Sequence, residues 1–227
     1  MIILGIDTTT PDGGVALVNE AGLIAAHRFG TEVGRAALLL PAMDALLSDH
    51  RMTFSDVEGI AVSVGPGSYT GVRVGLASAQ GLSLGRDVPI MPVGTLEAYA
   101  IAYSDQNGWI VPLLPARRDE TYWALFEQTP HGLTRLQPDT VSTWDAVLND
   151  LNALNHDLSL VGCVLHVDRF STLLGKRCTF PAPSAPLCLA THVAREGLRR
   201  FLVGEQPGAV LPNYISLFPR KPTPKAG

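Results

Sequence analysis

The segment Gly59-Ile-Ala-Val-Ser-Val-Gly-Pro-Gly-Ser-Tyr-Thr-Gly-Val-Arg-Val-Gly75 says most about the fold of this 227-residue chain. It opens with a short continuous run at 59–64, which is typical of a strand buried on both faces of a sheet. A glycine-rich turn follows and leads into a predicted helix that ends near residue 84. Such a turn directs backbone N–H groups outward at the helix start and favours anions. It contains no Gly-Lys-Ser/Thr and lacks the dinucleotide spacing, so it matches neither phosphate-binding motif.

The residues around this segment complete one recognisable order of elements. Three strands at 2–6, 14–18 and 23–29 precede a helix at 35–48, whose apolar residues recur with helical spacing. A strand at 90–93 and a helix at 95–102 follow. An antiparallel meander, then helix, strand, helix and strand, is the order of one lobe of the actin-like or sugar-kinase-like (ribonuclease-H-like) ATPases. We therefore predict an α/β fold of this two-lobed type.

The second half carries a weaker pattern and predicts a shortened second lobe. Two strands at 109–114 and 120–126 and two helices at 142–154 and 187–202 are expected there. Residues 1–104 carry 10 acidic and 5 basic side chains, whereas residues 105–227 carry 11 and 12. We predict a first lobe at 1–104 with partner-binding helices, a second lobe at 105–215, and a flexible, basic, proline-rich tail at 216–227.

Composition excludes several classes of protein. Apolar residues make up 46% of the chain and charged residues 17%, as in an ordinary globular protein. The net charge of −4 argues against a protein whose main task is to grip a phosphate backbone. Three cysteines without CxxC spacing exclude a disulfide framework and a zinc knuckle. With neither a signal-peptide pattern nor a run long enough for a membrane helix, we expect a soluble, cytoplasmic protein.

Asp7-Thr-Thr-Thr10, at the end of the first strand, is the candidate nucleotide site. In an actin-like ATPase this position holds an acidic residue near the magnesium ion, followed by a hairpin that contacts phosphate. Asp7, Thr8, Thr9 and Thr10 would supply the carboxylate and hydroxyl groups. The alternative is a strand-ending aspartate that caps the turn before Gly13 and Gly14.

Two helices have more apolar surface than one sheet can cover. In the helix at 70–84, Gly71, Gly75 and Ala79 lie four apart and form a smooth stripe. Such surplus faces predict a helix-on-helix interface between two subunits, or else burial of both helices between the lobes. The predicted partner interface comprises Leu38, Leu39, Ala42, Met43, Gly71, Val72, Gly75, Leu76 and Ala79.

No catalytic or metal-binding set stands out. The six histidines form no HExxH or HxxxH pair, and Ser68 does not lie in a Gly-x-Ser-x-Gly elbow. Arg195, Arg199 and Arg200 share one helix face, which is predicted to be solvated.

Together these residues resemble the TsaB family. The resemblance lies in Ile-Leu-Gly-Ile-Asp-Thr-Thr at 3–9, the glycine-rich motif at 65–75, Ala-Gln-Gly-Leu at 79–82 and Tyr-Trp at 122–123, and it covers nearly the whole chain. It implies a shortened actin-like fold with a degenerate nucleotide site, in a family also named glycoprotease-like. It also implies that helices 35–48 and 70–84 build a homodimer or a heterodimer. The partner would be the catalytic paralogue TsaD, with the ATPase TsaE, in the synthesis of threonylcarbamoyladenosine on tRNA.

The chain departs from the family pattern at Gly34, Pro115 and Ser216, where members often have His, Asp and Arg. The metal-binding histidine pair of the catalytic paralogue is absent. We therefore expect a non-catalytic scaffold subunit with no cofactor of its own. ATP and magnesium would bind at a subunit interface or in the partner, and tRNA only within the complex. The alternatives are an actin-like small-molecule kinase or ATPase that uses Asp7, and a peptidase that uses Ser68.

Overall fold

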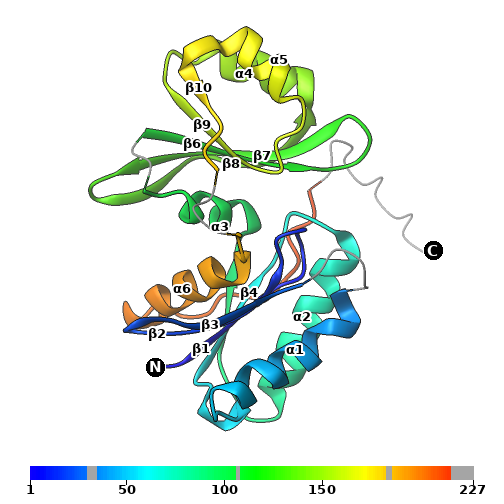
Figure 1. Cartoon of the computed structure of the whole chain (residues 1–227), viewed down its shortest axis with the longest axis vertical. Coiled ribbons are helices and arrows are strands. Elements are labelled where there is room, and N and C mark those ends of the chain that lie inside the picture. Colours follow the sequence, from blue (N-terminus) through cyan, green and yellow to red (C-terminus); the bar gives the residue numbers. More distant parts are fainter. Residues whose placement is uncertain (30–34, 106–107, 183–185, 216–227) are drawn as a thin grey trace, which may run out of the picture.

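Two five-stranded sheets, each with helices on both faces, make up the computed structural model (Figure 1). The structure describes residues 1–29, 35–105, 108–182 and 186–215. Gly34, Ser216 and the predicted tail at 216–227 lie outside these ranges. The predicted α/β, two-lobed actin-like class is confirmed.

The first sheet has the strand order β3-β2-β1-β4-β5. The first three strands form the antiparallel meander, and β4 and β5 continue parallel to β1. β1 and β4 are buried along their whole length, as continuous apolar runs predict. The elements are β1 (Ile3–Asp7), β2 (Gly14–Asn19), β3 (Gly22–Arg28), α1 (Arg35–Asp49), a 3₁₀ turn (Phe54–Asp56), β4 (Gly59–Ser63), α2 (Tyr69–Leu84), β5 (Ile90–Val93) and α3 (Thr95–Ala102).

The second sheet repeats this topology in a shortened form, with the order β10-β9-β6-β7-β8. β6, β7 and β8 form its meander, and β9 and β10 continue parallel to β6. Its outer helices have 10 and 8 residues, against 15 and 16 for α1 and α2. The elements are β6 (Gly108–Pro115), β7 (Glu120–Thr129), β8 (Gly132–Thr143), α4 (Trp144–Ala153), β9 (Leu158–Gly162), α5 (Val167–Leu174), a 3₁₀ turn (Gly175–Arg177), β10 (Cys178–Thr179) and α6 (Leu189–Leu202).

Three apolar cores hold these layers together. One lies between the first sheet and α1 and α2, and another between the second sheet and α4 and α5. The third lies between the two sheets, where α3 and α6 pack against each other (Figure 1). This central core joins the two lobes.

Helix α6 packs on the first sheet, although it follows the second sheet in sequence (Figure 1). Glycines allow the close approach: a Cβ at Gly5 would overlap Ala190 and Ala194, and a Cβ at Gly197 would overlap Ala61. The structure thus differs from the predicted division at 105–215, because the chain returns to the first lobe for its last helix. The first lobe is completed only by this late segment.

Candidate functional site

The carboxylate of Asp7, at the end of β1, is fully buried and bound by its own neighbours. Its Oδ1 accepts hydrogen bonds from the backbone N–H of Thr9 at 3.0 Å and from the Thr9 hydroxyl at 2.6 Å. Its Oδ2 accepts from the Thr10 hydroxyl at 2.6 Å. Asp7, Thr8, Thr9 and Thr10 are all at most 2% exposed. Asp7 therefore caps the β1–β2 turn from within.

Gly13 closes this turn tightly. Its N–H donates to the backbone oxygen of Thr10 at 3.2 Å. A Cβ at Gly13 would lie 2.6 Å from the backbone oxygen of Asp7 and 3.1 Å from its Oδ2. The turn can follow this path only with glycine at that position.

The glycine-rich motif that leads into α2 is joined to the same turn. The Ser68 N–H donates to the backbone oxygen of Thr9 at 2.9 Å, and the Thr8 hydroxyl donates to the backbone oxygen of Gly71 at 2.6 Å. A Cβ at Gly67 would lie 2.6 Å from the Thr9 oxygen. The hydroxyls of Thr9 and Thr95 are 3.1 Å apart, which ties α3 to the cluster.

Three N–H groups at the start of α2, those of Ser68, Gly71 and Val72, are used inside the chain and are not free for the predicted anion site. Ser68 donates to Thr9, and the Gly71 N–H donates to the Ser68 Oγ at 3.2 Å, which is an N-cap. The Val72 N–H donates to the backbone oxygen of Ser68 at 2.8 Å. No N–H among these three points to a free phosphate position.

A magnesium ion does not fit Asp7 in this arrangement. The carboxylate is 0% exposed, and a cation would have to displace the hydroxyls of Thr9 and Thr10. Within the described ranges, no group of three or more His, Cys, Asp or Glu side chains could hold a metal ion. Among the described residues, the buried hydroxyl of Ser63, at the end of β4, has no hydrogen-bond partner. One neutral hydroxyl is not a ligand set for magnesium.

The residues predicted to meet a partner lie mostly in the first lobe's own core. Gly75 faces the sheet, since its Cβ would lie 2.6 Å from the Thr8 Oγ1. Leu38 is half-buried. The remaining predicted residues are buried, namely Leu39, Ala42, Met43, Gly71, Val72, Leu76 and Ala79. The row of small residues on α2 therefore packs against the chain's own sheet. The buried residues of the predicted interface are not exposed to a partner.

The outward faces of α1 and α2 carry a different set of residues. Leu40 is 50% exposed and Leu84 is 87% exposed. The rest of the exposed apolar, small and aromatic set is Ala37, Pro41 and Ala45 of α1, and Tyr69, Ala77 and Gly81 of α2. On α2, Tyr69, Arg73, Ala77 and Gly81 recur every four residues and so share one face.

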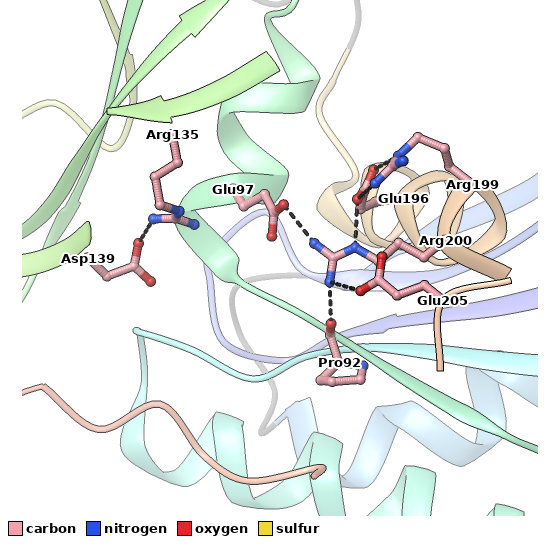
Figure 2. A network of polar contacts seen from close by, with 8 residues as sticks. All are labelled: Pro92, Glu97, Arg135, Asp139, Glu196, Arg199, Arg200 and Glu205. Atoms are coloured by element: carbon pink, nitrogen blue, oxygen red, sulfur yellow. Dashed lines mark hydrogen bonds and ion pairs between the residues drawn. The ribbon is translucent and has the colours of Figure 1, made fainter. Parts of the chain in front are cut away.

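A polar network between α3 and α6 was missed by the sequence reasoning (Figure 2). The Arg200 side chain is only 15% exposed, and it donates to Glu97 and Glu196 at 2.7 Å and to the backbone oxygen of Pro92 at 3.0 Å. Burial alone would raise the pKa of Glu196, but hydrogen bonds from Arg199 and Arg200 outweigh it and lower that pKa. The predicted solvated face is thus wrong for Arg200. Its contacts are structural and fix α6 against α3.

Comparison with known proteins decides the family. Residues 35–166, more than half of the chain, match the family model described as TsaD: tRNA N6-adenosine threonylcarbamoyltransferase. The tRNA threonylcarbamoyladenosine biosynthesis protein TsaB of Bacillus subtilis is 31% identical over 96% of this chain and 95% of its own length. The chain belongs to the TsaB family. TsaB of Escherichia coli is 36% identical over 59% of this chain and 58% of its own.

Solved structures agree with a TsaB fold. YeaZ from Pseudomonas aeruginosa superposes with a TM-score of 0.70 at 23% identity, covering 94% of this chain and 99% of that one. A second P. aeruginosa structure, described as similar to peptidase YEAZ, gives a TM-score of 0.73 at 25% identity, with 94% and 98% covered. An activator of 2-hydroxyisocaproyl-CoA dehydratase from Clostridium difficile, solved with bound ADPNP, shares the fold alone, with a TM-score of 0.52 at 10% identity over 90% of this chain and 97% of that one.

Proposed function

We propose that this TsaB-family chain takes part in threonylcarbamoyladenosine synthesis on tRNA as a non-catalytic subunit. Its relatives in B. subtilis and E. coli carry that biosynthetic role in their names. The observation that carries the non-catalytic part is the state of Asp7. Its carboxylate is buried and accepts three hydrogen bonds from its own turn, so the group that would hold magnesium in an ATPase of this fold is already used.

The proposed partner is a TsaD-type paralogue, docked on the outward faces of α1 and α2. Ala37, Ala45, Ala77 and Gly81 have small side chains and would allow partner helices to approach closely, while Leu40 adds apolar area. The role of the chain is then to hold the paralogue in its active arrangement. The same face would pair two copies when the paralogue is scarce.

The remaining parts of the assembly are proposals of the same kind. The ATPase TsaE joins the pair, and ATP and magnesium bind at a subunit interface or in a partner. The chain meets tRNA only within this assembly, in the cytoplasm. No helix among the described residues is long and apolar enough to cross a membrane.

Co-expression with the same organism's TsaD tests the proposal. Size-exclusion chromatography with light scattering, with and without ATP and magnesium, should show a one-to-one complex. Ala77→Arg, on the outward face of α2, should abolish it. Leu173→Arg is the matched control, since Leu173 is 45% exposed on α5 of the other lobe. Gly75→Arg is not a test of the interface, because Gly75 faces the chain's own sheet and a side chain there would disturb the fold.

The alternative, a kinase or ATPase using Asp7, predicts a different outcome. No complex would form under any condition, and the isolated chain would hydrolyse ATP with magnesium. That activity would disappear in Asp7→Asn. This result would overturn the scaffold proposal.

A further inference from the structure

Tyr69, Arg73 and Tyr214 form a cluster on the outward side of α2. The Arg73 Nε donates to the Tyr214 hydroxyl at 3.0 Å, and a second guanidinium nitrogen donates to the Tyr69 hydroxyl. The Arg73 Cζ lies 4.0 Å from the centroid of the Tyr69 ring, a cation–π contact. The two tyrosine rings are 5.1 Å apart between centroids. The guanidinium is therefore held in one position by two aromatic side chains.

Tyr214 comes from the end of the described chain and is held there from both lobes. The Asn213 N–H donates to the backbone oxygen of Val64 at 2.7 Å, just after β4. The Asn213 side chain donates to Asp139 of β8 at 2.9 Å, and Gln80 of α2 donates to the Val210 oxygen at 3.4 Å. The segment that carries Tyr214 thus lies beside α2. It adds to the outward face of this helix a side chain that lies more than 140 positions further along the sequence.

The cluster lies at one end of the face proposed for the partner. Tyr69 and Arg73 are followed, at four-residue intervals, by Ala77 and Gly81. Tyr69 is 48% exposed and Tyr214 is 38% exposed, so both rings keep surface for a partner. Tyrosine and arginine are among the residues that most often supply binding energy in protein interfaces, whereas alanine and glycine allow close approach.

We propose that Tyr69, Arg73 and Tyr214 anchor the TsaD-type partner, which places a carboxylate against Arg73. The inference rests on the proposed function and names the residues that give it affinity. Among the described residues, no carboxylate oxygen lies within 4 Å of the Arg73 nitrogens. A guanidinium covered by a partner is costly unless an opposite charge meets it, so an acidic partner surface is required.

Affinity measurements on the full chain with purified TsaD test this inference. Arg73→Ala should weaken the complex by about 30-fold or more, the size of a hot-spot loss. Tyr214→Phe removes the hydroxyl that positions Arg73 but keeps the ring, and should cause a smaller loss. Arg86→Ala is the control: Arg86 is also exposed, but it lies beyond the end of α2 and donates to the Phe54 oxygen at 2.8 Å. The Arg86→Ala variant should bind TsaD with the same affinity as the wild type.

Raising the salt concentration should weaken the wild-type complex more than the Arg73→Ala complex, because the lost contact is ionic. Wild-type affinity in Arg73→Ala would overturn the anchor while leaving the scaffold proposal intact. If the wild type binds no TsaD, both fall together. If Arg73→Ala and Tyr214→Phe keep their affinity for TsaD but lower that of the complex for tRNA, the cluster contacts RNA and the anchor is overturned. Thermal melting of each variant alone, unchanged from the wild type, establishes that any loss is a loss of contact.

Discussion

The hydroxyl of Thr8 donates a hydrogen bond of 2.6 Å to the backbone oxygen of Gly71, sixty-three residues further along the chain. A Cβ at Gly71 would overlap the backbone oxygen of Thr8, so the two segments meet without space for a side chain. The two motifs that stand out in the sequence, Asp7-Thr-Thr-Thr10 and the glycine-rich 65–75, are therefore two sides of one contact. Their main structural role is to fix α2 on the end of β1.

Gly71→Ala should destabilise the chain by about 3 kcal/mol or more, since an added methyl in a tight contact forces the backbone to shift. Gly81→Ala is the matched control on the same helix. A Cβ at Gly81 meets nothing within 4 Å. That change should raise stability by about 0.5–1 kcal/mol through helix propensity. Urea unfolding of both variants measures the difference, and equal stabilities would refute the close contact at Thr8.

Asp7→Asn should also lower stability, by about 2 kcal/mol or more, because one carboxylate oxygen becomes an NH₂ group that cannot accept a hydrogen bond. Both oxygens of Asp7 accept hydrogen bonds from buried donors, so water cannot replace a hydrogen bond that the variant loses. Chemical denaturation gives the value. A variant as stable as the wild type would show that the turn does not depend on this carboxylate.

The first sheet could be predicted because β1, β2 and β4 are short, buried apolar runs and the helix that follows β3 is periodic. In the second lobe, β8 was missed because it contains Pro138 and Val141 is its only buried residue. As an edge strand it tolerates a proline, which has no N–H to pair. α5 was missed because it has eight residues and buries only Phe170 and Leu174.

The candidate sites show a different limit of sequence reasoning. Periodicity groups Gly71, Gly75 and Ala79 on one face of a helix, but it does not say which face meets the sheet. These small residues predict a contact with a partner because they let another chain segment approach the helix closely. In the structure the segment that approaches is the chain's own Thr8. The packing of α6 and Tyr214 against the first lobe cannot be read from the local pattern of apolar and polar residues, because those contacts join residues far apart in sequence.

Arg200→Met should destabilise the chain by about 3–5 kcal/mol, because it leaves Glu97 and Glu196 partly buried without their shared cation. Arg199→Met is the control. It removes a contact to the same Glu196, but the Arg199 side chain is 58% exposed, so the loss should be within about 1 kcal/mol. Denaturant melts of the two variants provide the comparison. Similar losses would mean that the network in Figure 2 does not depend on burial.

His192 of α6 should make the fold sensitive to mild acid. Burial, with a smaller contribution from the charge of Arg195, lowers the pKa of His192 to about 4. The unfolded chain takes up this proton near pH 6.5, so between pH 6.5 and 4 it binds more protons than the folded chain and stability falls as pH falls. Above that window His192 is neutral in both states and contributes no pH dependence.

His192→Gln should therefore reduce the stability lost between pH 7 and pH 5 by about 1–2 kcal/mol. Equilibrium unfolding in urea at the two pH values measures this, as the difference between the variant and the wild type. His131→Gln is the control, because His131 is exposed in the β7–β8 turn. It should leave the pH dependence as in the wild type. A loss in His192→Gln as large as in the wild type would assign the acid sensitivity between pH 7 and pH 5 to other groups. Glu196 is not one of them, because its pKa is lowered from the ordinary value and its contribution to stability is lost only below this window.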